Sequence, residues 1–430
     1  MAGEYDTAPL GEVASVRSGF AFKSSDWAEN GIPVVKIANV KDGRLVMDGC
    51  SFVPQAVADS AAEFALQVGD ILIAMTGYVG DVAIVRERDL PAALNQRVGR
   101  FAIRDRRRLD QRFLFYLLRD ADVRQEIEGL GYGSAQPNVS PSLIHGVEVP
   151  LPPLPEQRAI AHILGTLDDK IELNRRMSET LERQARALFK SWFVDFDPVR
   201  AKAEGRDPGL PQPLANLFPD SFEDSALGEI PKGWEVKPLD EIARFLNGLA
   251  LQKYPPTGER SLPVIKIAQL RAGTTDGADR ASADLEPAYI VQNGDILFSW
   301  SGSLECVLWA AGPGALNQHL FKVTSDKYPK WLCYLGVHHH LEDFRHIAAG
   351  KATTMGHIQR HHLSDAKLAT PSQALLRAID AVFAPIVESI WRRAVESRTL
   401  AALRDALLPK LISGELRVKD AKRFVAEATA

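Results

Sequence analysis

The chain contains 430 residues, of which 46% are hydrophobic and 25% are charged. These proportions are ordinary for a globular protein, and they exclude collagen-like, disulfide-rich and disordered classes. The net charge of −4 at neutral pH, taken as an average over the chain, argues weakly against a nucleic-acid partner. At roughly 150 residues per domain, the length predicts about two to four domains.

The cysteines and the apolar segments indicate the compartment. Cys50, Cys306 and Cys333 lie far apart without C-x-x-C spacing, which fits a reducing compartment and excludes a cysteine zinc site. The first residues lack a basic region followed by an apolar one, and no apolar run approaches the roughly 18 residues that span a bilayer. We therefore expect a soluble, cytoplasmic protein.

Residues 1–152 predict a globular α/β unit with a substantial sheet. Short β-rich runs separated by glycine and polar turns indicate strands, and one helical pattern follows them. The predicted strands are residues 34–40, 71–76, 82–85 and 98–103, and the predicted helix is residues 110–128.

Residues 153–192 predict one long helix. Apolar residues recur at alternating steps averaging about 3.5 residues, as in a coiled-coil seam. This seam comprises Ile160, Leu164, Leu167, Ile171, Leu181, Ala185 and Leu188, and the polar residues Asn174 and Ser178 interrupt it.

Residues 193–235 form a distinct linker. Its six prolines exclude one continuous helix. It carries nine acidic and four basic residues, a net charge of −5, so the rest of the chain has a net charge of +1.

Residues 236–370 predict a second α/β unit, and residues 371–415 predict a second long helix before a tail of residues 416–430. The unit has β-rich runs at 264–270, 296–300 and 306–309 and a helical pattern at 329–345. The second seam comprises Ile379, Phe383, Ile386, Ile390, Leu400 and Leu407, with Arg393 and Ser397 at its polar positions.

Short matching runs show that the chain is an internal repeat. They occur in the same order in both halves: Pro33-Val-Val-Lys-Ile-Ala38 with Pro263-Val-Ile-Lys-Ile-Ala268, Gly69-Asp-Ile-Leu72 with Gly294-Asp-Ile-Leu297, Leu94-Asn-Gln96 with Leu316-Asn-Gln318, and Val149-Pro-Leu-Pro152 with Leu368-Ala-Thr-Pro371. The distance along the sequence between matching runs falls from 230 residues at the first pair to 219 at the last, as expected for one duplicated unit with small deletions in its second copy.

The shared 219-residue interval also relates the two helices. We infer that they pack on each other in an antiparallel coiled coil about 60 Å long, with their polar positions meeting at mid-length. The alternative is two unrelated amphipathic helices, each packed on its own domain.

Two features of the repeated units suggest contact with a polyanion. Residues 86–124 contain eleven arginines and six acidic residues, and residues 319–367 contain eight of the ten histidines. Two types of loop contain small and polar residues: one follows each Gly-Asp-Ile-Leu strand, and the other is glycine-rich and lies at residues 131–138 and 350–357. Their amide, hydroxyl and cationic groups could contact bases or phosphates. The alternative is a solvated surface with ordinary turns.

No catalytic motif accompanies these features. The sequence has no phosphate-binding G-x-x-x-x-G-K-[ST] loop, G-x-S-x-G elbow, H-E-x-x-H pair or Asn-Pro-Pro-aromatic run. The histidines at 338–340, 346, 357 and 361 suggest a metal site, but no cysteine or carboxylate set completes one. We interpret them as surface or DNA-facing residues and predict no metal site.

Several motifs together resemble the specificity subunit of type I restriction-modification systems over essentially the whole chain. They are Pro150-Leu-Pro-Pro-Leu-Pro-Glu-Gln-Arg158, Lys190-Ser-Trp-Phe-Val-Asp-Phe-Asp-Pro198, Gly228-Glu-Ile-Pro-Lys-Gly-Trp234, the Gly-Asp-Ile-Leu strands and Leu407-Leu-Pro-Lys-Leu-Ile-Ser-Gly-Glu-Leu416. The resemblance implies two target-recognition domains separated by two antiparallel helices. Each domain would read half of a bipartite DNA site, and the helices would set the unread gap.

The resemblance also implies partners. Double-stranded DNA would be bound together with two modification subunits, which use S-adenosylmethionine to methylate adenine N6, and with restriction subunits that use ATP and Mg²⁺. This chain would hold no cofactor and have no catalytic activity. The alternatives are an enzyme with its own methyltransferase or nuclease activity, and a coiled-coil scaffold without DNA specificity.

We assign candidate DNA contacts to both units. In the first they are Lys23, Ser24, Thr76, Tyr78, Arg97, Tyr132, Ser134, Gln136 and Asn138. In the second they are Gln252, Lys253, Ser299, Trp300, Ser301, His319, Lys351, Thr353, Thr354 and His357. The Leu-Asn-Gln runs next to Arg97 and His319 are either contacts or structural turns.

Overall fold

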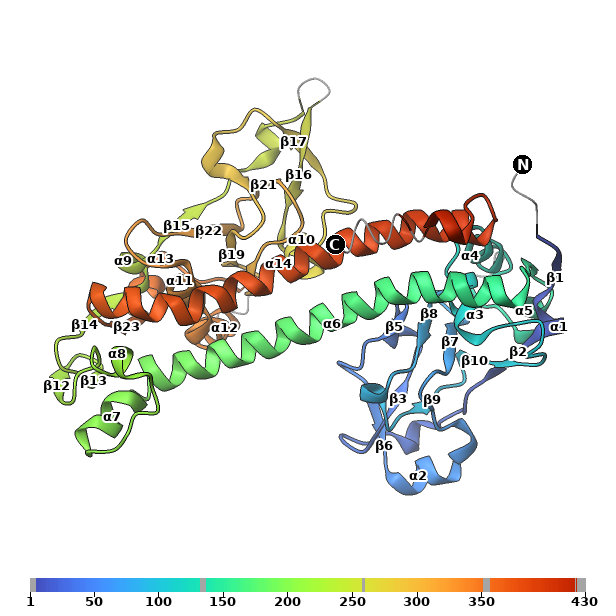
Figure 1. Ribbon diagram of the computed structural model, residues 1–430, viewed down its shortest axis with the longest axis horizontal. Coiled ribbons are helices and arrows are strands. Elements are labelled where there is room, and N and C mark those ends of the chain that lie inside the picture. Colours follow the sequence, from blue (N-terminus) through green and yellow to red (C-terminus); the bar gives the residue numbers. More distant parts are fainter. Residues whose placement is uncertain (1–4, 132–136, 257–259, 351–355, 422, 424–430) are drawn as a thin grey trace. The chain divides into compact units, whose positions relative to one another are not determined.

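The computed structural model describes residues 5–131, 137–256, 260–350, 356–421 and 423 (Figure 1). Contacts within the chain divide it into two units. Unit 1 comprises residues 1–170 and 400–430, and unit 2 comprises residues 171–399. Each unit contains a sheet-rich domain and part of each of two long helices.

Unit 1 is built on an antiparallel sheet with strand order β2-β10-β7-β8. Smaller sheets adjoin it, with orders β6-β3-β9, β4-β5 and β1-β11. The strands are β1 Thr7–Pro9, β2 Ala14–Ser18, β3 Ile32–Val35, β4 Val40–Lys41, β5 Arg44–Leu45, β6 Ser51–Val53, β7 Ile71–Ala74, β8 Val82–Ile84, β9 Ala93–Leu94, β10 Val98–Ile103 and β11 Glu148–Pro150. The helices are α1 Leu10–Val13, α2 Gln55–Ser60, α3 Gln111–Leu117, α4 Ala121–Gly129 and α5 Pro141–His145, followed by the start of α6 Leu154–Phe193.

Unit 2 is built on an antiparallel sheet with strand order β15-β22-β19-β20. The other sheets have orders β17-β16-β21-β18, β14-β23 and β12-β13. The strands are β12 Phe222–Ser225, β13 Gly228–Pro231, β14 Glu235–Pro238, β15 Arg244–Asn247, β16 Ser261–Ile265, β17 Arg280–Ser282, β18 Ile290–Val291, β19 Ile296–Ser299, β20 Cys306–Leu308, β21 Gly314–Leu316, β22 Leu320–Thr324 and β23 Lys367–Thr370. The helices are α7 Asp197–Ala203, α8 Gln212–Ala215, α9 Leu239–Ile242, α10 Ile267–Ala272, α11 Lys330–His339, α12 Leu341–Ala349, α13 Arg360–Asp365 and α14 Gln373–Ile412.

The two units repeat one topology, as the sequence repeat predicts. The order β2-β10-β7-β8 corresponds to β15-β22-β19-β20, and β1-β11 corresponds to β14-β23. In both units one small sheet contains a parallel pair, β3 with β9 and β16 with β21. The matched runs therefore occupy matched places: each Gly-Asp-Ile-Leu run leads into the third strand of the large sheet, and each Leu-Asn-Gln run precedes its second strand.

Some predicted elements have different boundaries. The helical pattern at 110–128 is two helices, α3 and α4, because Asp120 caps α4 by accepting from the backbone N–H groups of Asp122 and Val123. The pattern at 329–345 likewise becomes α11 and α12. The prediction of a strand at 264–270 is wrong beyond Ile265. Helix α10 begins at Ile267, and the side chain of Gln269 caps it by accepting from the N–H of Lys266 at 3.3 Å.

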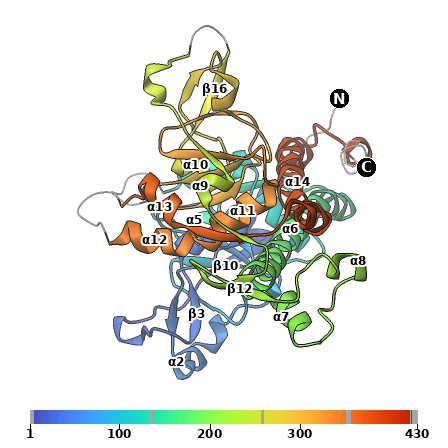
Figure 2. The same ribbon diagram turned by 90° about the vertical axis from the view of Figure 1, so that its left-hand side faces the viewer.

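The proline-rich linker is folded and packs on the C-terminal end of α6. In both views α7, α8 and the β12–β13 hairpin lie beside this end (Figure 1, Figure 2). The Phe218 ring contacts Trp192 with centroids 5.7 Å apart, and the Phe196 ring contacts Trp234 at the same distance. Because burying a large apolar side chain contributes about 1.5–3 kcal/mol, these rings stabilise the linker despite its six prolines.

Helices α6 and α14 each contain 40 residues. Of the seam residues, Ile160, Leu164, Leu167, Asn174, Ile379, Phe383, Ile390, Leu400 and Leu407 are buried, whereas Ile171, Leu181, Leu188, Ile386 and Arg393 are half-buried. Ring contacts join the helices in unit 2, where Phe383 lies 5.6 Å from Trp192 and 6.3 Å from Phe193.

The helices run antiparallel, and equivalent residues meet where they cross. In unit 2, Arg393 donates to Asn174 Oδ1 at 3.2 Å, and Asn174 Nδ2 donates to Glu396 at 2.9 Å. Asn174 and Arg393 are 219 residues apart, which is the repeat interval. Two equivalent positions contact each other in an antiparallel pair only at its midpoint, so the polar layer marks the crossing of the two copies.

A buried ion cluster joins the same helices in unit 1. The Asp168 carboxylate accepts from Arg404 at 2.6 Å, from Arg119 at 3.1 Å and from the Tyr116 hydroxyl at 2.9 Å. Burial favours the neutral acid, but the two guanidinium groups outweigh it and hold the pKa of Asp168 below its usual value.

Among the described residues, no helix is both long and apolar enough to cross a membrane.

Candidate nucleic-acid interface

In unit 1, three chain segments meet at the end of β7. The backbone N–H of Met75 donates to the carbonyl of Arg97 at 3.1 Å, and the N–H of Val139 donates to the carbonyl of Met75 at 2.8 Å. The N–H of Gly77 donates to Pro137 at 3.0 Å. The turn after β7, the turn before β10 and the segment before α5 therefore form one fixed surface.

Thr76 and Asn138 also join two of these segments through their side chains. Thr76 Oγ1 donates to Asn138 Oδ1 at 2.7 Å, and the two residues form an isolated antiparallel bridge. Beside them lies a cleft of about 500 Å³, lined by Ser18, Met75, Thr76, Gln96, Arg97, Asn138, Val139, Ser140 and Pro141. Tyr78, on the β7–β8 turn, is 59% exposed. Three candidate contacts, Thr76, Arg97 and Asn138, thus line one polar cleft.

The Leu-Asn-Gln runs form structural turns that present the residue after them. Asn95 Oδ1 accepts from the N–H of Arg97 at 3.3 Å, and Asn317 Oδ1 accepts from the N–H of His319 at 3.2 Å. Gly248 approaches this turn so closely that a Cβ would lie 2.3 Å from the carbonyl oxygen of Asn317. The asparagines therefore fix the turns, while Arg97 remains exposed and His319 half-buried.

Unit 2 repeats the backbone arrangement of this surface. The N–H of Trp300 donates to the carbonyl of His319 at 3.4 Å, and the N–H of Ile358 donates to the carbonyl of Trp300 at 3.0 Å. The N–H of Gly302 donates to Gly356 at 2.8 Å. These bonds correspond one by one to those in unit 1, so the duplicated fold builds the same surface twice.

The side chains on the second surface are different. Ser301 Oγ lies 3.1 Å from His319 Nδ1, and Ser301 forms an isolated antiparallel bridge with His357. The Trp300 ring lies 5.8 Å from the ring of His319 and 6.3 Å from that of His357, and its Nε1 donates to Asn247 at 2.9 Å. An aromatic cluster thus replaces the side chains that line the cleft of unit 1.

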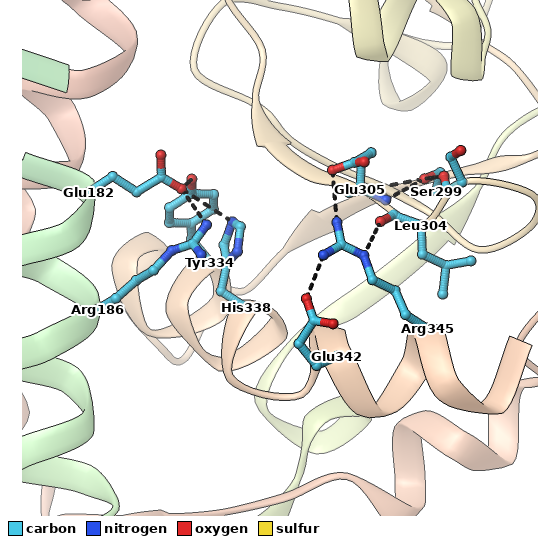
Figure 3. Close-up of polar contacts among 10 residues, drawn as sticks. Glu182, Arg186, Ser299, Leu304, Glu305, Tyr334, His338, Glu342 and Arg345 are labelled. Atoms are coloured by element: carbon cyan, nitrogen blue, oxygen red, sulfur yellow. Dashed lines mark hydrogen bonds and ion pairs between the residues drawn. The ribbon is translucent and has the colours of Figure 1, made fainter. Parts of the chain in front are cut away.

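In both units one arginine holds the turn of a β-hairpin, which is β7–β8 in unit 1 and β19–β20 in unit 2. Arg124 of α4 pairs with Asp81 at 2.7 Å, and Arg345 of α12 pairs with Glu305 at 3.1 Å. Arg345 also donates to the carbonyl of Leu304 at 3.0 Å (Figure 3). The acidic residue immediately before β8 or β20 is therefore a structural anchor for the turn that carries the candidate contacts.

The assignment of Ser299 as a DNA contact is wrong. Its side chain is fully buried, and its hydroxyl donates to Ser303 at 2.6 Å and accepts from the N–H of Glu305 at 2.8 Å (Figure 3). Ser299 ends β19 with its side chain on the inner face, whereas Ser301 lies beyond the strand end. Ser299 therefore shapes the turn and cannot reach a duplex.

The other candidates lie elsewhere. Lys23, Ser24, Gln252 and Lys253 are exposed in or beside short 3₁₀-helices, and they do not line the cleft. Tyr132, Ser134, Gln136, Lys351, Thr353 and Thr354 lie outside the described residues. The roles of all these residues stay predictions.

Most arginines of the basic stretch in unit 1 contact other parts of the unit. Their side chains donate to carbonyls or pair with carboxylates in the cases of Arg88, Arg100, Arg104, Arg108, Arg112, Arg119 and Arg124. Arg97, Arg106 and Arg107 differ, because no side-chain hydrogen bond or ion pair joins their guanidinium groups to a described residue, and of these three only Arg97 lines the cleft. Composition alone could not separate these structural arginines from a ligand-facing one.

The interpretation of the histidine run as surface residues is wrong for His338. Its side chain is only 5% exposed, both ring nitrogens lack a hydrogen bond among the described residues, and Nε2 lies 3.9 Å from Glu182 of α6 (Figure 3). Burial, followed by the nearby charge of Arg186, lowers the pKa of His338 to about 4. Burial also lowers the pKa of His340 to about 4. These neutral rings do not supply positive charge to DNA.

Sequence reasoning missed Ser18, Gln96 and Ser140, which line the cleft of unit 1. Gln96 was detectable because it belongs to the repeated Leu-Asn-Gln run. Ser18 and Ser140 carry no comparable signal, because only the fold brings the end of β2 to the start of α5. Within the described ranges, no group of three or more His, Cys, Asp or Glu side chains is placed to hold a metal ion.

Comparisons with known proteins agree with this architecture. Residues 3–183 and 231–375, more than half of the chain, match the family model of the type I restriction modification DNA specificity domain. The chain is 27% identical to the type I restriction enzyme MjaIX specificity subunit of Methanocaldococcus jannaschii, over 82% of this chain and 78% of the relative. It is 26% identical to the HindI specificity subunit of Haemophilus influenzae, over 71% of this chain and 77% of the relative.

A solved structure shares the fold. The crystal structure of the type I restriction-modification system S subunit from M. genitalium aligns with a TM-score of 0.55 over 95% of this chain and 96% of that one. The sequence identity is 15%, so this likeness bears on the fold alone.

Proposed function

The chain belongs to the type I restriction-modification DNA specificity family, and from this premise we propose how it recognises DNA. Each unit reads one half of a bipartite, asymmetric site in double-stranded DNA. Helices α6 and α14 set the length of the unread gap between the halves.

One observation carries the proposal: the same surface is built twice and bears different side chains. Equivalent backbone bonds hold the three segments in each unit, whereas Met75, Thr76, Arg97 and Asn138 of unit 1 are replaced by Trp300, Ser301, His319 and His357 in unit 2. Because base edges are distinguished by their donor and acceptor patterns, one scaffold with two side-chain sets fits two different half-sites.

The helices support the gap part of the proposal. At about 1.5 Å per residue, each 40-residue helix has a length of about 60 Å. The antiparallel pair and its polar crossing fix the helices against sliding. Two long paired helices suit a fixed gap better than a flexible linker does.

The proposal extends to the partners. The chain docks two modification subunits, which hold S-adenosylmethionine and methylate adenine, and it joins restriction subunits that use ATP and Mg²⁺. The chain itself supplies recognition without catalysis or a bound cofactor. The net charge of −4 fits a DNA-recognition subunit in which many charged residues pair with one another. The partner subunits would then add contacts to the DNA phosphates.

Adenine methylation tests the proposal directly. The chain is co-expressed with its modification subunits in a host without its own adenine methylation, and N6-methyladenine is mapped across the genome. We expect one bipartite motif with two defined halves and a fixed gap, and no such motif from the modification subunits alone. Methylation without a bipartite motif contradicts the proposal, and methyl transfer by the isolated chain would make it an enzyme instead.

Duplex binding provides the second measurement. With the modification subunits present, affinity for a duplex carrying the motif falls linearly with salt on logarithmic axes, because phosphate neutralisation releases counterions. A duplex with both halves scrambled binds more weakly. Equal binding of the two duplexes would support a coiled-coil scaffold without DNA specificity.

A further inference from the structure

Arg97 and His319 occupy the same place in the two copies of the fold. Each follows a Leu-Asn-Gln run, and each has its N–H held by the side chain of the preceding asparagine, at 3.3 Å and 3.2 Å. The carbonyl of Arg97 accepts from the N–H of Met75, which follows β7, and the carbonyl of His319 accepts from the N–H of Trp300, which follows β19. The fold therefore presents one exchangeable side chain at a rigid position in each unit.

In unit 1 this side chain is an exposed guanidinium beside the polar cleft. It forms no hydrogen bond or ion pair with the residues that the structure describes, although the neighbouring Arg100 binds two carbonyls at 2.8 and 2.9 Å. The backbone of Arg97 is fixed at both its N–H and its carbonyl. A long, unpartnered cation on a fixed backbone is suited to bind an external ligand.

The chemistry of that ligand follows from the guanidinium and the cleft. A guanidinium presents parallel N–H donors, which match either the O6 and N7 acceptors of guanine or a phosphate. Gln96 and Asn138, on two walls of the cleft, supply amide groups that hydrogen-bond with base edges. An amide presents a donor beside an acceptor, which matches the mixed edge of a base, whereas a phosphate offers acceptors only, so this combination favours a base edge.

In unit 2 the equivalent histidine is already engaged. His319 Nδ1 lies 3.1 Å from Ser301 Oγ, and Nε2 lies 3.4 Å from Gln318 Nε2. The Trp300 ring stands 5.8 Å from the ring of His319 and is itself held by Asn247. An imidazole lacks the parallel donors of a guanidinium, so unit 2 cannot make the same two-bond contact.

From this asymmetry we propose that the position of Arg97 and His319 determines specificity, and that Arg97 reads a guanine through its O6 and N7. The inference rests on the proposed function and adds the base class and the residue that reads it. It predicts that the half-site of unit 1 contains a G·C pair contacted by Arg97, and that substitution of Arg97 leaves the other half-site unchanged.

The test uses the complete chain with its modification subunits and three variants. Arg97→Ala removes the guanidinium, and Arg97→Lys keeps the charge but loses the parallel donors. Arg107→Ala is the control, because Arg107 is also exposed, lies outside the cleft and has no side-chain bond to a described residue. Because the Arg97 and Arg107 side chains have no partner within the described residues, all three variants should unfold at the wild-type temperature.

Genome-wide methylation mapping and competition binding give the readout. We expect both Arg97 variants to relax one G·C position in one half-site, with discrimination there reduced roughly 5- to 150-fold. Arg107→Ala keeps the full motif. If both Arg97 variants keep every base preference, or if Arg97→Ala weakens all duplexes equally and only reduces the salt slope, the contact is absent or is to phosphate, and the inference is wrong.

The wild-type motif separates this inference from the proposed function. A bipartite motif without a G·C pair in either half would overturn the role of Arg97 and leave the function intact. A wild-type complex without any bipartite motif would overturn the function itself.

Discussion

Asp168 shows how a single carboxylate organises charge in unit 1. It accepts hydrogen bonds from Tyr116 and Arg119 of the domain and from Arg404 of α14. Its side chain is 13% exposed, and those of Arg119 and Arg404 are 12% and 14% exposed. A buried acid with two buried cations is stable only while all partners are present, because removing one leaves an uncompensated charge.

Asp168→Asn is therefore expected to lower the free energy of unfolding by about 3–5 kcal/mol. The neighbouring Asp169→Asn is a matched control, because Asp169 pairs with Arg112 at 2.6 Å while its side chain is 62% exposed. Exposed pairs contribute about 0–1 kcal/mol, so this variant should be nearly as stable as the wild type. Urea unfolding measures both. Equal losses in the two variants would contradict the special position of Asp168.

The same carboxylate predicts a pH dependence. Burial raises the pKa of Asp168, but Arg119 and Arg404 outweigh burial, so the folded-state pKa lies below its ordinary value of about 3.9. Its contribution to stability is fully present above that ordinary value and is lost as the pH falls through the folded-state pKa. Urea unfolding at pH 7, 5 and 3 should show a constant difference between wild type and Asp168→Asn down to pH 5 and a smaller one at pH 3. An unchanged difference at pH 3 would count against the ionised cluster.

Residue roles were only partly predictable from the sequence. The repeat located the equivalent loops, because matched runs fold alike, and Thr76, Arg97 and Asn138 line one cleft, while their contact with DNA stays a prediction. The sequence could not show that β19 ends at Ser299, so it could not separate this buried serine from Ser301 two residues later. Nor could it show which arginines meet carboxylates brought close only by the tertiary fold.

At the scale of elements, the long helices were predictable and the short ones were not. A seam sustained over several heptads sets its own period, so the predicted ranges 153–192 and 371–415 lie close to α6 and α14. The breaks between α3 and α4 and between α11 and α12 depend on single caps and local packing. Tertiary contacts, not the pattern of apolar residues, decide those boundaries.

The polar crossing of α6 and α14 is the element with the clearest energetic test. Asn174 is fully buried and bonds to Arg393 and Glu396 of the other helix. Asn174→Ala leaves these charged partners without it and should cost about 1–3 kcal/mol of unfolding free energy. Ser178→Ala, one turn along the same seam, should change stability by less than about 0.5 kcal/mol, because Ser178 has no side-chain hydrogen bond to a described residue.

A double-mutant cycle distinguishes a direct bond from general helix weakening. If Asn174 and Arg393 interact directly, the double alanine variant should lose less stability than the two single variants combined, by about 0.5–3 kcal/mol. Chemical denaturation of the four proteins provides the cycle. Strict additivity would mean that the two equivalent residues do not stabilise the crossing through each other.

At the scale of the whole molecule, duplication explains why one chain carries two recognition surfaces. The two copies have the same strand order, the same three backbone ties and the same arginine-held hairpin turn. The smaller sheets differ between the copies, and so do the side chains that the shared backbone ties present, such as Arg97 and His319. Selection for a new half-site can therefore change surface residues such as Arg97 without altering the scaffold.

The proposed function makes the length of the helix pair a determinant of the DNA gap. Removing residues 171–177 and 390–396 deletes one heptad from each helix around the crossing, which shortens the pair by about 10 Å while nearly keeping the phase of the seam. At about 3.4 Å per base pair, the unread gap of the methylation motif should shorten by about three base pairs, with both half-sites unchanged. A five-residue deletion from each helix is the control: it turns the following part of the helix by about 140° and should abolish methylation instead of shortening the gap. A gap of wild-type length in the heptad variant would show that the helices do not set the spacing.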